Sequence, residues 1–299
     1  MYLDSPDSLS ILLKKLELSA EVYVNGDFCG TWAVDTSGSQ RIPFHLIGAG
    51  QAWLHFDGQE PKALNSGDLV LFPHDNAHIM SHSMQVPTED SINVDMVDDG
   101  GPATNMICGF FEFKDKAALP LIAALQPAIV LGLGERSTHD VINRLIELMV
   151  GELKKAEPGY YAVVDHLAYL LFVQILRQQI DTGELSQGLL AALFDKKIGK
   201  AINCIHTQPA KKWTLDSLAT ECAMGRSSFA ARFNELVGMP AMQYLSFWRM
   251  QEASRLLQKT QLALIEIAEQ SGYDSEASFS KAFKKVTGQT PGAVRRQAK

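Results

Sequence analysis

The sequence lacks an apolar run long enough to cross a lipid bilayer, which needs about 20 residues. Its most apolar stretch, residues 167–176, is much shorter and follows Asp165 and His166. The N-terminal residues 1–6 contain no basic segment followed by an apolar one, so we expect no signal peptide. Cysteine is scarce as well, with four residues in 299, which excludes a disulfide scaffold. We therefore expect a cytoplasmic protein that does not bind membranes.

An excess of basic residues is also missing, since the formal net charge of the whole chain is −7. This balance alone argues against nucleic acid as a partner. The charge is unevenly distributed, however. From Asp195 onward the chain has 16 Lys and Arg against 9 Asp and Glu. A basic C-terminal third on an otherwise acidic chain is typical of a DNA-binding module joined to a different domain.

Residues 213–292 contain the same unit twice, which indicates one supersecondary structure used two times. Matching positions lie 49 or 50 residues apart: Ala219 and Ala268, Phe229 and Phe279, Phe233 and Phe283, and Gly238 and Gly288. In each copy a short helix with a small alanine precedes a turn and a second helix. The phenylalanines recur at i and i+4, so they face inward. The second helix then exposes short polar and basic side chains that fit a DNA major groove.

These residues resemble the DNA-binding domain of AraC-type transcription regulators, which contains two helix-turn-helix motifs. The resemblance rests on Trp213-Thr214-Leu215, Met224 to Phe229, Tyr244-Leu245, Trp248-Arg249-Met250, Ala253 to Leu257, Ile267-Ala268, Gly272 to Ser275 and Pro291-Gly292. It implies a DNA-binding domain over residues 190–299, with a long helix over about 241–259 that joins the motifs. Pro240-Ala241 departs from the Ser-Pro usual in the family.

The motif match also assigns roles to single residues. Base edges are expected to be read by Arg226, Ser227, Ala230 and Ala231 from the first recognition helix, and by Glu276, Ala277, Ser280 and Lys281 from the second. Phosphate contacts are expected from Arg232, Lys284, Lys285, Arg295 and Arg296. The alternative is that these side chains are simply solvated surface residues.

Short alternating segments fill residues 20–113 and predict a β-sandwich or small barrel. Within them, residues 67–78 place a Gly, a Pro and His78 at the spacing of the second cupin motif. Together with Trp32, Phe44-His45 and residues 108–110, this resembles the cupin-like sensory domain that precedes some AraC-type DNA-binding domains. We assign residues 1–130 to such a domain, whose effector would be a small molecule, a metal or an oxidant.

Metal-binding cupins supply a His-x-His pair and a Glu from their first motif, but this chain has only His45 there. A full cupin metal site is therefore absent. His45, His78 and Cys108 remain candidates for a zinc site, which His74 or His82 could join. The alternative is that His45 and His78 are half-buried strand residues that bond to neighbouring backbone.

The resemblance also raises oxidant sensing, since some regulators with this type of domain respond through cysteines. Cys29 and Cys108 are the candidates, and both are expected near strand ends, where they could bridge. Inert buried thiols are the alternative.

Residues 131–185 predict two helices, 137–155 and 160–181, and then a polar linker. The second helix is apolar nearly all round, so it needs burial on more than one side. In the family such helices form a homodimer interface, while burial within one subunit is the alternative.

The expected fold is α+β and multidomain: a cupin-like β-barrel followed by helices, then an all-α domain with two helix-turn-helix motifs. The expected function is that of a sequence-specific, non-enzymatic transcription regulator that binds double-stranded DNA and works with RNA polymerase, with activation as the expected mode. One alternative is a metal-dependent cupin enzyme fused to a DNA-targeting module. Another is a constitutive DNA-binding protein whose barrel serves only dimerisation.

Overall fold

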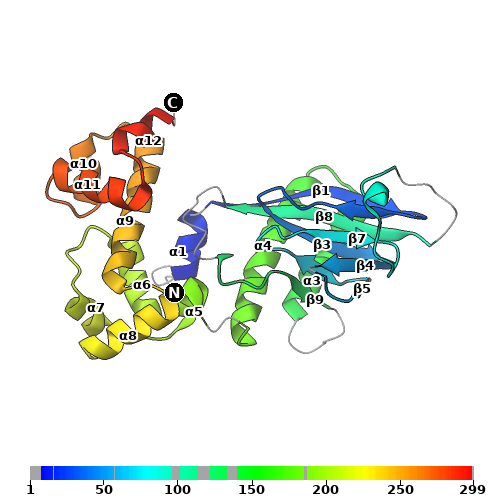
Figure 1. Cartoon of the computed structure of the whole chain (residues 1–299), viewed down its shortest axis with the longest axis horizontal. Coiled ribbons are helices and arrows are strands. Elements are labelled where there is room, and N and C mark those ends of the chain that lie inside the picture. The colour runs from blue at the N-terminus through cyan, green and yellow to red at the C-terminus, as the bar shows by residue number, and fades with distance from the viewer. Residues whose placement is uncertain are drawn as a thin grey trace. The chain divides into compact units, whose positions relative to one another are not determined.

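The computed structural model describes residues 8–15, 17–56, 58–95, 102–113, 122–132, 140–184 and 187–297. The chain forms two compact units, shown in Figure 1. The barrel unit comprises residues 16–182, and the helical unit comprises residues 1–15 together with 183–299. Among the described residues, no helix has both the length and the apolar character to cross a membrane.

Two antiparallel sheets make up the barrel unit and confirm the predicted β-rich fold. One has the order β1-β8-β3-β6-β9 and the other the order β2-β7-β4-β5. The bounds of the first sheet are β1 Leu18–Phe28, β8 Thr104–Phe113, β3 Ile42–Ala49, β6 Leu69–Leu71 and β9 Ile129–Leu131. Those of the second are β2 Ala33–Asp35, β7 His78–Ser81, β4 Gln51–Phe56 and β5 Lys62–Asn65, and a 3-10 turn, η1, spans Glu89–Ser91.

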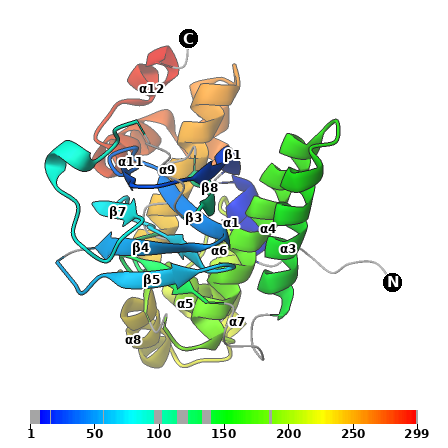
Figure 2. The ribbon, with the colours of Figure 1, turned by 90° about the vertical axis from the view of Figure 1, so that its right-hand side faces the viewer.

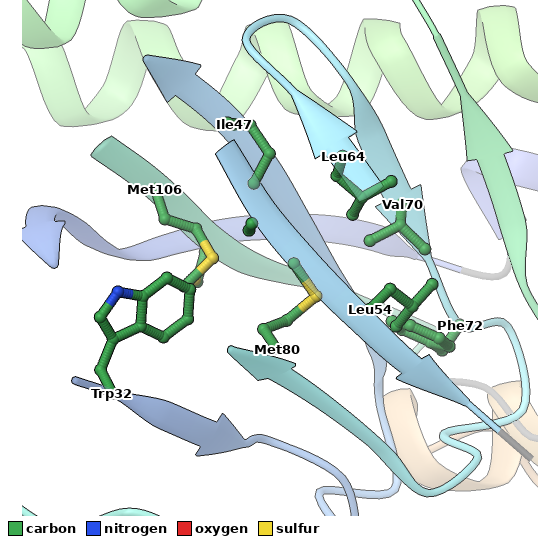
Figure 3. Close-up of a cluster of buried hydrophobic side chains, with 10 residues drawn as sticks. Trp32, Ile47, Leu54, Leu64, Val70, Phe72, Met80 and Met106 are labelled. Carbon is green, nitrogen blue, oxygen red and sulfur yellow. The ribbon is translucent and has the colours of Figure 1, made fainter. Parts of the chain in front are cut away.

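The space between the sheets is filled by apolar side chains, shown in Figure 3. They come from both sheets and from the segment that leads into β2: Trp32, Ile47, Ala52, Leu54, Leu64, Val70, Phe72, Met80, Met106 and Cys108. Strand β3 is buried on both faces. Its residues alternate between this core and the opposite face of the sheet.

Helices α3 (Asp140–Lys155) and α4 (Tyr160–Asp181) lie side by side, as Figure 2 shows, and α4 packs on β1. The ring of Phe172 on α4 lies 4.7 Å from that of Phe111 on β8, and Asp165 accepts a hydrogen bond from the backbone N–H of Val22. The helices predicted over 137–155 and 160–181 are both present, the second with the predicted ends. Both are part of the barrel unit and form no separate region.

All described elements of the helical unit are helices: α1 Ser8–Lys15, α5 Gly188–Phe194, α6 Ile198–Thr207, α7 Leu215–Glu221, α8 Arg226–Val237, α9 Ala241–Lys259, α10 Leu264–Gln270, α11 Glu276–Thr287 and α12 Pro291–Gln297. Helix α9 has the predicted bounds. Its first half packs with α6 and α8, and its second half packs with α10, α11 and α12 (Figure 1).

The N-terminal end of the predicted first domain, residues 1–130, groups by its contacts with the helical unit. Helix α1 packs against α6 and belongs to the helical unit. The reason is its apolar face, because Leu9, Leu12 and Leu13 are almost completely buried. The barrel unit is therefore inserted in the chain between α1 and the rest of the helical unit.

Candidate DNA interface and buried polar cluster

The two helix-turn-helix motifs, α7–α8 and α10–α11, are packed in the same way. Phe229 and Phe233 on α8 have ring centroids 5.6 Å apart, and Phe279 and Phe283 on α11 are also 5.6 Å apart. All four rings are fully buried, against the small Ala219 in the first motif and Ala268 in the second. The inward orientation predicted from the i, i+4 spacing is confirmed.

The turns of the two motifs have different residues at their left-handed position. Ala223 has a φ of 49° in the first turn, where the second turn has Gly272 with a φ of 77°. A Cβ at Gly272 would lie 2.6 Å from a guanidinium nitrogen of Arg249 and 2.8 Å from the carbonyl oxygen of Ala210. The second turn thus needs glycine both for its left-handed backbone and for this close approach.

Opposite the phenylalanines, the recognition helices α8 and α11 expose the residues predicted to meet DNA. Exposed positions are Arg226, Ser227, Ala231, Arg232, Glu276, Ala277, Lys281, Lys284 and Lys285, while Ala230 and Ser280 are half-buried. The helices also begin differently. Ser275 caps α11 by accepting the backbone N–H of Ser278, whereas α8 follows Gly225 and has no side-chain cap.

The charges on these two helices have different surroundings. Arg226 lies 3.1 Å from Asp216, and Arg232 lies 3.1 Å from Asp195 and 3.2 Å from Glu235. Both arginines of α8 are therefore already paired with carboxylates.

On α11, by contrast, Lys281, Lys284 and Lys285 form no ion pair with any residue that the structure describes. Of the two arginines predicted on α12, Arg295 donates to the carbonyl of Leu262 at 2.6 Å, which ties it to the α9–α10 loop. Unpaired positive charge is concentrated on the second recognition helix.

A buried polar cluster interrupts the apolar interior of the barrel unit. His45 on β3 and His78 on β7 have their Nε2 atoms 3.1 Å apart, and the hydroxyl of Thr36 lies 3.1 Å and 3.0 Å from them. On its other side, Nδ1 of His45 lies 3.1 Å from Sγ of Cys108 on β8. The structure thus brings together all three predicted zinc residues. It adds Thr36, for which the sequence carries no signal.

Burial keeps this cluster neutral. It lowers the pKa of His45 from 6.5 to about 3, with the neighbouring His78 acting in the same direction, and it lowers the pKa of His78. Burial also raises the pKa of the Cys108 thiol to about 12. Nδ1 of His78 donates to the carbonyl of Asn76 at 2.8 Å, so its Nε2 accepts. A consistent arrangement has Nε2 of His45 donating to the Thr36 hydroxyl, the Thr36 hydroxyl donating to Nε2 of His78, and the Cys108 thiol donating to Nδ1 of His45.

Comparison with known proteins assigns the chain to a family. A family model described as "Cupin" matches residues 7–181, and one described as "Helix-turn-helix domain" matches residues 218–297. An uncharacterized HTH-type transcriptional regulator of Haemophilus influenzae is 30% identical over 97% of this chain and 98% of its own length. The chain belongs to the AraC-type transcription regulators.

Two further similarities fit this family. The RCS-specific HTH-type transcriptional activator RclR of Escherichia coli is 27% identical over 86% of this chain and 85% of its own length. The DNA-binding domain of AdpA, solved in complex with a target DNA, is 25% identical, covers 34% of this chain and 92% of that one, and has a TM-score of 0.33. Since its relatives are named as transcriptional regulators, this AraC-type protein is a DNA-binding regulator and not an enzyme.

The predicted zinc ligands of this regulator do not converge on one point. Two nitrogen ligands of a tetrahedral zinc ion lie roughly 3.3 Å apart, so the Nε2 atoms of His45 and His78 have a suitable separation. Cys108 lies at the opposite nitrogen of His45 and cannot share that ion. Among the described residues, no group of three or more His, Cys, Asp or Glu is arranged for a metal. Residues 45, 78 and 108 thus do not fit a four-ligand zinc site.

The other histidines considered for zinc bond elsewhere. Nε2 of His74 donates to the carbonyl of Leu125 at 2.9 Å, and Nδ1 of His82 lies 3.0 Å from the carbonyl of Trp32. Both thus bond to backbone carbonyls. Of the two histidines for which neighbouring-backbone bonds were the alternative, His78 makes one, to Asn76.

The register of β1 and β8 also separates the two candidate redox cysteines. Cys108 pairs with Val24, whereas Cys29 follows the end of β1 at Phe28. Five residues of extended strand span roughly 16 Å, and a disulfide needs Cα atoms within about 7 Å. The expected direct bridge between Cys29 and Cys108 is therefore incompatible with this structure. Cys29 is half-buried and Cys108 is buried, and both are free thiols.

The buried histidines predict acid sensitivity of the barrel unit. A histidine whose pKa falls on folding stabilises the fold fully above pH 6.5, and this contribution is lost as the pH falls toward 3. Between pH 7.5 and 4.5 we expect His45 to lower the free energy of unfolding by about 2–3 kcal/mol.

Urea unfolding of chelator-treated protein at both pH values, compared with His45→Gln, measures this contribution. The variant should lose less stability over the same interval. An equal loss in both proteins contradicts the assignment of a buried neutral His45.

Proposed function

We propose that this regulator reads two successive segments of one DNA major groove, with α8 in the first and α11 in the second. Exposed short side chains on both recognition helices support base contacts from Ser227 and Ala231 on α8 and from Glu276, Ala277 and Lys281 on α11. Arg226, Ala230 and Ser280 flank these positions on the same helices. The repeated packing of the two motifs is the observation that carries this proposal, because it presents two equivalent helices from one domain.

The helices differ in how they contribute to affinity. The lysines of α11 neutralise phosphates and release counterions, which makes binding depend on salt. Arg232 instead joins α8 to Asp195, whose carboxylate accepts the first backbone N–H groups of α6 at Lys197 and Ile198. In this proposal Arg232 acts within the protein and not on phosphate, unlike the role predicted from the sequence.

Salt titrations test this division. DNA is first selected from random duplexes by the wild-type chain, and its affinity is then measured at increasing salt. Lys284→Gln should reduce the slope of log K against log salt by about 1. Arg232→Gln, the matched control, should leave the slope unchanged. If Arg232→Gln reduces the slope as much as Lys284→Gln, the proposed division is wrong.

For the signal, we propose that the cupin domain responds to an oxidant. The name of the relative RclR describes an activator specific for RCS, and that relative aligns over 86% of this chain. Cys29 is the accessible thiol of this domain among the described residues, and two electrons would pass from its sulfur to the oxidant, giving a sulfenic acid. Cys108 is buried beside His45 and reacts second. Zinc at His45 and His78 stays a prediction, which metal analysis of the purified protein checks.

Oxidant treatment of the purified chain distinguishes the cysteines. Hypochlorite should change the affinity for the selected DNA at least about threefold, and mass spectrometry should find Cys29 modified first. Cys29→Ser should abolish the change, Cys108→Ser should keep most of it, and Cys204→Ser serves as control. A response that persists in the Cys29→Ser/Cys108→Ser protein rules out thiol sensing in this domain. DNA binding that is insensitive to any effector would favour the constitutive alternative.

We also propose that a second copy of the chain packs on α3 and α4. Each helix exposes two apolar residues seven positions apart and therefore on one face: Val141 and Leu148 on α3, at 53% and 58%, and Val163 and Leu170 on α4, at 45% and 47%. A homodimer would cover these stripes. The dimer would then act in the cytoplasm and contact RNA polymerase at its promoters.

Sedimentation tests the dimer. Leu148→Glu and Leu170→Glu should each shift the protein toward monomer by at least about tenfold in dissociation constant, because each buries a charge at the interface. Val86→Glu is the control, since Val86 is 71% exposed outside these helices. Unchanged dimerisation in both helix variants would exclude this surface.

A further inference from the structure

Each helix-turn-helix motif has its own hydrophobic core, and α9 contributes to both. Arg249 lies on α9 between these two cores. The preceding residue, Trp248, is buried in the first core, where His206 of α6 stacks on it with ring centroids 3.7 Å apart. The following residue, Met250, is buried in the second core with Ile267 and Phe279. A side chain at position 249 can therefore reach parts of both motifs.

Toward the first motif, Arg249 binds the loop that connects α6 to α7. Its Nε donates to the carbonyl of Pro209 at 2.7 Å, and its NH2 group donates to the carbonyl of Lys211 at 2.9 Å. The loop leads directly into α7, whose capping residue Thr214 accepts the backbone N–H of Ser217. Two bonds from one guanidinium to this loop fix both the distance and the angle between α9 and the first motif.

Toward the second motif, the same guanidinium lies against the turn between α10 and α11. Its central carbon is 5.7 Å from the ring centroid of Tyr273, within reach of a cation–π contact. The space beside it is so limited that a Cβ at Gly272 would lie 2.6 Å from its nitrogen. The ring of Tyr273 in turn packs on Phe279 of the recognition helix α11, with centroids 5.9 Å apart.

We propose that Arg249 is a positioning residue that sets the relative orientation of the two recognition helices, and thereby the spacing of the DNA segments that this regulator accepts. Arg249 need not touch DNA, because it acts through the α6–α7 loop and the α10–α11 turn. The planar guanidinium is required, since a lysine ammonium is a single point of charge and cannot hold both carbonyls while covering Tyr273. The inference rests on the proposed reading of two groove segments.

A second contact also joins the α6–α7 loop to the α10–α11 turn, and it supplies a control. Lys212 lies 3.1 Å from Asp274, but these side chains are 79% and 86% exposed. An exposed pair of this kind contributes little to stability. Removing it should therefore leave the orientation of the motifs unchanged.

The experiment measures spacing preference with the full-length chain. Duplexes selected by the wild-type chain are footprinted to locate the two contacted segments, and one base pair is then inserted or deleted between them. Each such change turns one segment by roughly 35° relative to the other. The wild-type chain should lose at least about tenfold in affinity for either altered duplex.

Arg249→Gln should bind the unaltered duplex about tenfold more weakly and lose less than about threefold on the altered ones. Arg249→Lys should show the same change to a smaller degree. Lys212→Ala should retain the wild-type preference. Tyr273→Leu, which keeps an apolar side chain but removes the ring, should relax the preference as well and covers the case in which Arg249→Gln does not fold.

Two outcomes would overturn the inference. If the Arg249 variants lose affinity equally for all spacings, Arg249 contributes only to stability. If Lys212→Ala relaxes the spacing preference as strongly, any contact between the α6–α7 loop and the α10–α11 turn has this effect, and Arg249 has no special role. Failure of the wild-type chain to select any duplex would instead contradict the proposed function.

Discussion

The structure depends most on one helix that belongs to two hydrophobic cores at once. Tyr244 and Trp248 of α9 are buried with the first motif, and Ala253 and Leu257 are buried with the second. Its 19 residues make a rod of about 28 Å at 1.5 Å per residue. One turn of DNA is roughly 34–36 Å long. A single continuous helix thus joins the two helix-turn-helix motifs, and its length is on the scale of the groove repeat.

The two motifs are more alike in their interiors than on their surfaces. The phenylalanine pairs have the same separation in both copies, because a close-packed interior leaves few alternatives. Outward positions are free of that constraint, and the first copy pairs its arginines with carboxylates while the second leaves its lysines unpaired. One fold therefore presents two electrostatically different faces to a uniformly charged partner.

Features governed by local periodicity could be predicted from the sequence, whereas features that depend on distant partners could not. The bounds of α9 and α4 and the inward direction of Phe229 and Phe279 follow from helical spacing. The placement of His45 beside His78 followed from the cupin motif. The contact between Cys108 and Nδ1 of His45 could not be predicted. It depends on strand register and on side-chain rotamers, which a sequence motif does not specify.

The same limit applies to charge. The motif match predicts a phosphate contact for Arg232, and in the structure its guanidinium pairs with Asp195, 37 positions away. The sequence shows a charge, and only the packing of α8 beside α6 shows its partner. The left-handed backbone of Ala223 in the first turn could not be predicted either, because this conformation is unusual for a residue with a side chain.

The burial of α1 against α6 has a consequence for the topology of the molecule. Because residues 8–15 and residues 187–297 share one folded body, the barrel unit is tethered to that body at both of its ends. A fragment that starts after residue 182 would lack α1, and the surface of α6 on which α1 packs would then be exposed. In its contacts, this chain differs from a simple series of an N-terminal barrel and a C-terminal helical domain. It is better regarded as one helical domain that hosts a barrel as an insert.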